Sequence, residues 1–175
     1  MAVVTSPFTE EDSKQAFLKW HANCGPNALA FACGLHIEQV RGVIPGFETK
    51  QYTSPTMMRA ALETLGKWFT AVGAPKPKPG AWASVENMFH PHFTALVRIQ
   101  WEGPWTEPGA NPKWAYRHSH WIATWECERT GFVFDVNGGV RNFQSWDTQV
   151  APAIAEQIER ASGVWYPTHI WRINP

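Results

Sequence analysis

Three segments of the sequence carry side chains that could act together as a nucleophile, a base and an orienting acid. Cys24 precedes a run of small residues, His120 leads an apolar segment, and Asp135 ends the next apolar segment. The partial positive charge at a helix start favours a thiolate over a thiol, and the N–H groups there could stabilise an oxyanion. Gly25 has no side chain, so a carbonyl group could approach those N–H groups. The residue types therefore indicate thiol catalysis with Cys24 as the nucleophile.

His120 and Asp135 fall in two segments, about 118–126 and 131–136, that we expect to pair as an antiparallel hairpin. Directly opposed residues share a face of such a hairpin. If His120 lies opposite Asn137, Asp135 shares the face of His120 and its carboxylate can orient the imidazole. A register shifted by one residue would place Asp135 on the other face and would exclude it from the site.

The elements that would position these residues are predicted from capping signals and from apolar spacing. Helices are expected at about 9–20, from 23 or 24 to 33, at about 37–41, from 54 to about 65, and at about 150–158; strands are expected at 93–101, 118–126, 131–136 and 168–173. A proline-rich connector, 74–80, separates a helical half (about 9–72) from a sheet half (about 93–173). Helices followed by an antiparallel sheet predict an α+β fold, with residues 1–175 as a single domain.

The composition bounds the class of protein. The 175 residues carry 15 Lys and Arg against 15 Asp and Glu, so a general nucleic-acid or membrane-surface binder is not expected. Near-zero charge limits solubility and suggests a protein partner in an assembly. The three cysteines are an odd number without a disulfide pattern, which favours reduced thiols and a cytoplasmic location, and Cys33 fits a core position. We expect no signal peptide, no membrane span and no cofactor.

The order of these motifs resembles the papain-like cysteine peptidases. Cys24-Gly25 opening a helix of small residues, then TSPTMMRAALETLG, then HWIATWECERTGFVFDVN, is most similar to the bacteriocin-leader-peptidase-like branch. The resemblance covers roughly residues 20–139. It implies a papain-like fold, N-terminal helices carrying the nucleophile packed on an antiparallel sheet, and hydrolysis of a peptide or isopeptide bond by Cys24, His120 and Asp135. In the family the third member can also be Asn, so Asn137 competes with Asp135.

One position departs from the family pattern. Such peptidases usually place a glutamine about six residues before the nucleophile as an oxyanion donor, and this chain has Leu18 there. The polar candidates for that role are Asn23, His21 and Gln15. The departure keeps a second hypothesis open, in which the chain is a catalytically silent papain-like module that binds a peptide or a partner protein within a larger assembly.

A metal site is the rival chemistry. His90 with His92, and His118 with His120, form two HxH pairs, whose alternate residues would share a face in a strand as metal ligands must. We expect no metal, because Pro91 inside the first pair suggests a turn and the Cys24 segment would have no role.

Two tryptophans lie close in sequence to the candidate site residues. Trp121, beside His120 in the strand, is expected to pack behind the site on the opposite face. Trp20, just before the nucleophile segment, is the candidate for a wall of the substrate groove.

Overall fold

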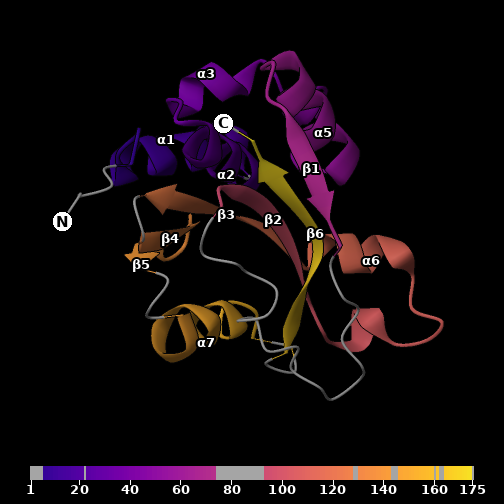
Figure 1. Ribbon diagram of the computed structural model, residues 1–175. Helices are drawn as coiled ribbons and strands as arrows, with labels where there is room; N and C mark the ends of the chain where they lie inside the picture. Colours follow the sequence, from indigo (N-terminus) through magenta and orange to yellow (C-terminus); the bar gives the residue numbers. More distant parts are fainter. Residues whose placement is uncertain are drawn as a thin grey trace.

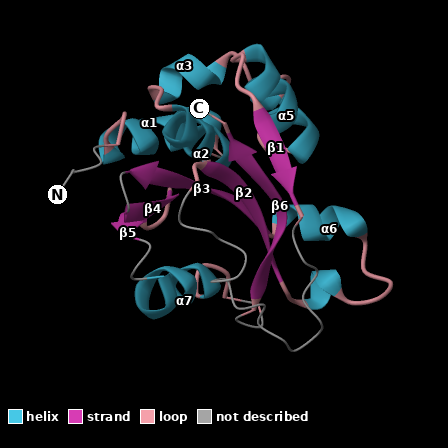
Figure 2. Ribbon diagram, in the orientation of Figure 1, coloured by secondary structure: helices cyan, strands magenta, loops and turns pink. Residues whose placement is uncertain are grey.

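The computed structural model describes residues 6–21, 23–73, 93–127, 130–142, 146–159, 161 and 164–174. It is an α+β structure in which helices cover both faces of a six-stranded antiparallel sheet (Figures 1 and 2). The strands are β1 (Phe69–Val72), β2 (Ala95–Trp101), β3 (Ser119–Cys127), β4 (Thr130–Asp135), β5 (Gly139–Asn142) and β6 (Trp165–Ile173), in the spatial order β1-β6-β2-β3-β4-β5. The connector 74–80 and the pair His90 and His92 lie outside the described residues.

The N-terminal helices are α1 (Glu10–Trp20), α2 (Cys24–Cys33), α3 (Ile37–Arg41), α4 (Phe47–Lys50) and α5 (Pro55–Thr64). They form where the sequence predicts them, except α4, which was not expected and has no side-chain cap. Thr9 and Asp12 form a reciprocal capping box at the start of α1, and Ser54 caps α5. Gly34 ends α2 in the left-handed conformation, at φ 66°.

The core has two parts, one on each face of the sheet. On one face, the helices α1, α2, α3 and α5 pack over Leu96, Trp121 and Phe134. On the other face, a π-helical turn, η4 (Trp146–Val150), and α7 (Ala151–Ala155) pack over side chains that include Ile99 and Ile122. Because both faces are covered, every residue of β2 is buried, although the alternating pattern of residues 93–101 is typical of a strand with one wet face.

Several further elements were not expected from the sequence. β1 lies inside the half predicted to be helical and pairs along β6, so the sheet draws on both halves of the chain. β5 continues the β3–β4 hairpin. The segment between β2 and β3 contains a 3₁₀ turn, η2 (Pro104–Thr106), and α6 (Pro112–Arg117). Among the described residues, no helix is both long enough and apolar enough to cross a membrane.

Candidate active site

Cys24 is the first residue of α2, with Asn23 as the N-cap. A buried polar network fixes this helix start on α1. Ser13 Oγ donates to Asn27 Oδ1 over 2.6 Å, Asn27 Nδ2 donates to the Asn23 carbonyl over 2.8 Å, and Asn23 Nδ2 donates to the Ser13 carbonyl over 3.0 Å. The half-buried thiol therefore sits on a rigid support at the positive end of the helix dipole.

Gly25 has a packing role that differs from the expected one. A Cβ at this position would overlap Thr53, lying 2.6 Å from the Thr53 Cβ. Contacts this short do not occur between real side chains, so the close approach of the segment before α5 requires glycine at residue 25. Glycine at residue 25 leaves space for Thr53, which lines the same hollow as Cys24.

His120 and Asp135 come together through the hairpin register. Ala123 lies opposite Phe134 and Thr124 opposite Val133, and this register extrapolates to His120 opposite Asn137. The expected register is confirmed. His120 Nε2 and Asp135 Oδ1 are 2.8 Å apart, and each residue is only 5% exposed. The carboxylate can thus hold the imidazole in one orientation, as an orienting acid must.

Asp135 is held by two further donors. The backbone N–H of Asn137 donates to Oδ1 over 3.0 Å, and Gln157 Nε2 donates to Oδ2 over 2.6 Å. The Asn137 side chain donates to Gln157 Oε1 over 2.9 Å, so it supports the network and does not bond to His120. Burial acts to raise the pKa of Asp135, but the bonds and charge of His120 and these donors outweigh it and hold the pKa below its usual value.

Gln157 had no signal in the sequence. It follows α7, and it reaches the hairpin only because α7 packs on that face of the sheet. No motif or spacing links residue 157 to residue 135, so only the tertiary structure identifies it.

Cys24 and His120 lie close enough for each to shift the pKa of the other. Burial acts to raise the pKa of Cys24, but His120 and the backbone N–H groups of Trp121 and Gly25 outweigh it, so the pKa falls below its ordinary value. Burial acts to lower the pKa of His120, but the Cys24 charge and the bond to Asp135 outweigh it and raise the pKa to about 10. The directions of the two shifts favour a thiolate beside an imidazolium at neutral pH.

The ring nitrogens of His120 divide between the two partners. Because Asp135 engages Nε2, Nδ1 is the nitrogen left for the Cys24 thiol. The indole of Trp101 lies 5.7 Å from the imidazole, centroid to centroid, and helps to bury it. An imidazole fixed at Nε2 and free to exchange a proton at Nδ1 can act as base and then as acid.

The three candidate side chains for the oxyanion lie differently from one another. Gln15 is exposed on α1, and its amide donates to Glu11 Oε1 over 2.8 Å. Asn23 is adjacent to Cys24, but its amide is bonded to the Ser13 carbonyl. His21 is exposed at the end of α1, with φ 58°. What remains next to the nucleophile is the start of α2, whose first N–H groups have no acceptor within the helix.

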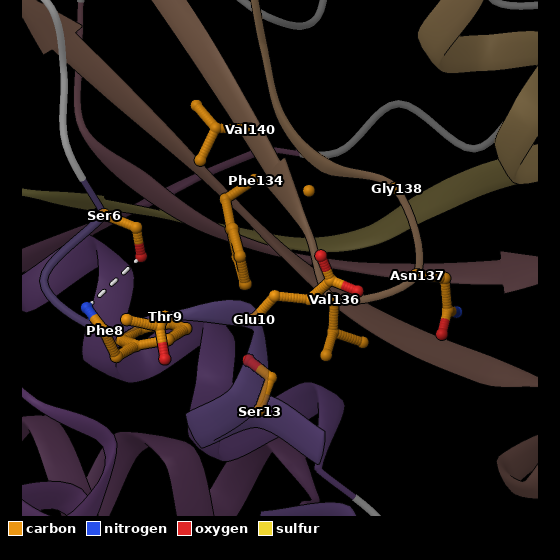
Figure 3. A pocket seen from close by; sticks show the side chains of 11 residues that line it. Ser6, Phe8, Thr9, Glu10, Ser13, Phe134, Val136, Asn137, Gly138 and Val140 are labelled. Atoms are coloured by element: carbon orange, nitrogen blue, oxygen red, sulfur yellow. Dashed lines mark hydrogen bonds between the residues drawn. The ribbon is translucent and has the colours of Figure 1, made fainter.

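Hollows lie on two sides of the site. One, of about 400 Å³, is bordered by Cys24, Thr53, Tyr116 and Trp121. On the other side, hollows of about 410 and 510 Å³ share Glu10, Ser13, Val136 and Asn137, and the larger one also borders Asn23. Figure 3 shows the first of these two, with Ser13 of α1 facing Phe134 and Val136. An extended chain could therefore contact the protein on both sides of the thiol.

The two tryptophans lie differently from the expectation. Trp121 does lie on the face opposite His120, but α2 packs on that same face, so Trp121 borders the hollow at Cys24 and donates from Nε1 to the Thr53 carbonyl over 2.9 Å. Trp20 is only 3% exposed and packs edge-on against Phe47 in the core, so it is not a groove wall.

His118 and His120 do not form a joint metal site. β3 begins at Ser119, so His118 lies outside the strand, stacked on Trp105 at 3.5 Å, with Nδ1 2.8 Å from the Trp114 carbonyl. His120 is engaged by Asp135. The described part of the chain contains no group of three or more His, Cys, Asp or Glu side chains arranged to hold a metal ion.

No protein-family model matches the chain, and no curated protein matches its sequence.

Proposed function

We propose that this protein is a papain-like cysteine hydrolase that cleaves a peptide or isopeptide bond with Cys24, His120 and Asp135. The observation that carries the proposal is the buried His120–Asp135 pair beside Cys24, supported by opposite pKa shifts of the thiol and the imidazole. The α+β architecture, with the nucleophile at the start of a helix packed on an antiparallel sheet, is consistent with a papain-like fold.

In the proposed reaction, the Cys24 thiolate attacks the carbonyl carbon and forms a C–S bond. The negative charge moves to the carbonyl oxygen, for which we assign the N–H of Cys24 as a donor. His120 gives its proton to the leaving amine as the C–N bond breaks, which leaves a thioester. Water then loses a proton to His120 and attacks the thioester, and the acid product and the thiolate are released.

A second candidate function is a silent papain-like module that binds a peptide or a partner protein. The observation that favours it is the commitment of Gln15 and Asn23 to other partners, which leaves the oxyanion without an identified side-chain donor. In this alternative the hollows beside Cys24 would bind a chain without cleaving it.

Labelling with a broad peptide-based thiol-peptidase probe separates the two functions. The native protein should be labelled at Cys24, mapped by mass spectrometry, and Cys24→Ala should not be labelled. Buried Cys33 is the internal control, because burial raises the pKa of its thiol to about 11. Absence of labelling and of peptide hydrolysis, together with peptide binding that Cys24→Ala retains, would contradict the enzyme and support the module.

A further inference from the structure

The hollow bordered by Cys24 has a one-sided charge. Its charged lining residues, among those that the structure describes, are Lys50 at the end of α4 and Arg117 at the end of α6. Both side chains are exposed, and neither forms an ion pair with a described residue, whereas Lys14, Arg41 and Arg59 each do. Two cations without an acidic partner therefore border the space beside the nucleophile.

A third cation lies under the same wall. Arg98 on β2 is opposite Trp121 in the sheet and only 6% exposed. Its guanidinium lies 5.2 Å from the ring centroid of Tyr116, which lines the hollow, and Nη1 donates to Thr168 Oγ1 over 3.0 Å. Its Nε is buried without a hydrogen-bond partner among the described residues, and no described carboxylate pairs with it.

A buried cation without an acid is costly, and a protein normally balances it with an anion. The charge of Cys24 acts to raise the pKa of Arg98, so this cation lies within electrostatic reach of the nucleophile. The rings of Tyr52, Tyr116 and Trp121 line the hollow and can pack against an apolar part of a ligand. The chemistry that fits is a carboxylate on a short apolar stem.

We propose that this hollow is a subsite for a carboxylate of the substrate, held by Lys50 and Arg117 and favoured by the buried Arg98. The inference rests on the proposed function and names its substrate class: peptides with an acidic side chain, or a chain end, close to the bond that is cleaved. The hollow of about 400 Å³ exceeds the size of one acidic side chain, so neighbouring atoms of the peptide can also enter it.

The test uses matched electrophilic peptide probes, acyloxymethyl ketones with Glu or Gln at successive positions before the reactive carbonyl. At low salt, the Glu probe should label Cys24 about tenfold faster than the Gln probe at one position, and added salt should reduce this ratio. In the Lys50→Glu/Arg117→Glu double variant the ratio should fall to one or below. Lys113→Glu is the matched control, because Lys113 is exposed on α6 but does not line the hollow, and the ratio should persist.

Competition with short peptides that end in a free carboxylate or in an amide distinguishes the two sources. Stronger competition by the free acid, without a Glu preference, assigns the subsite to a chain end, and a Glu preference assigns it to a side chain. Equal labelling by Glu and Gln probes, together with equal competition by acid and amide, overturns the carboxylate subsite alone. Absence of labelling by every probe overturns the proposed function and this inference with it.

Discussion

His120 Nε2 and Asp135 Oδ1 lie 2.8 Å apart in a bond that joins the neighbouring strands β3 and β4. Both groups are nearly fully buried, so the bond works in a medium of low dielectric, where an unpaired partner would be costly.

The triad residues should differ in their effect on hydrolysis. Cys24→Ala should abolish it, His120→Ala should lower kcat/KM by about 10³-fold, and Asp135→Asn by about 10–100-fold, because an amide can still accept the ring N–H. Asn137→Ala should have the mildest effect, because its backbone N–H, which bonds to Asp135, is kept. A rate for Asn137→Ala far below that of Asp135→Asn would assign the third role to Asn137.

The same variants should lose stability unequally. Because Asp135 is buried and accepts three hydrogen bonds, Asp135→Asn should lower the free energy of unfolding by about 1–3 kcal/mol. Asn137→Ala should cost less, because that side chain is more exposed. Urea unfolding followed by tryptophan fluorescence measures both, and an unchanged stability of Asp135→Asn would contradict the buried pairing.

Alkylation of Cys24 by iodoacetamide should be nearly independent of pH across the neutral range. The lowered pKa of Cys24 keeps the thiolate present at pH values where an ordinary thiol is protonated, and the rate should fall only at acidic pH. His120→Ala removes the stabilising imidazolium, so its rate should rise steeply with pH toward the pKa of an isolated thiol. A neutral-range profile equally steep in wild type and His120→Ala would contradict the ion pair.

Gln157 should act as a positioning residue. Gln157→Ala removes the 2.6 Å bond to Asp135 Oδ2, so the Asp135 pKa should rise toward its ordinary value. A carboxyl group whose pKa is lowered by folding stabilises the fold at pH values above its pKa in the unfolded chain, and this stabilisation is lost as the pH falls. The variant has less of this stabilisation, so its acid unfolding should begin at a higher pH. The exposed Gln149 supplies the control, and Gln149→Ala should keep the wild-type acid transition. An identical transition in both variants would mean that Gln157 does not support the carboxylate.

Gly25→Ala should destabilise the protein by several kcal/mol and reduce Cys24 labelling, because its Cβ would overlap Thr53. Combining it with Thr53→Gly should restore part of the stability, since the overlapping atoms are then removed. Gly42→Ala is the control, since nothing lies within 4 Å of the added Cβ. Melting temperatures decide the matter, and equal values for Gly25→Ala and Gly42→Ala would contradict the close approach.

The local features of the fold could be predicted because they depend on neighbours in the sequence. The capping residues Thr9 and Ser54, and the glycine that ends α2, fixed those helices locally. β1 was not predicted, because a strand of four residues that is not fully buried on either face has no clear period, and its pairing with β6 is remote in sequence.

The candidate site could also be predicted only in part from the sequence. The spacing in the hairpin was enough to place His120 and Asp135 together, since one register decides the face. The side of the sheet on which α2 packs could not be predicted from this spacing. Because α2 packs on the face of Trp121, that residue borders the hollow at Cys24. Gln157 and Arg98 were missed because their partners are brought near only by the packing of α7 and by the pairing of β2 with β6.

The place of β6 between β1 and β2 has a consequence for synthesis of the protein. During translation β6 emerges after the other five strands, yet it supplies the pairing that joins β1 to the rest of the sheet. Until then, one edge of β2 is an open row of hydrogen-bonding groups, and a nascent chain in this state is prone to pair with other chains. A ribosome that pauses before residue 165 would therefore hold a chain with Cys24, His120 and Asp135 already made but with its sheet still divided.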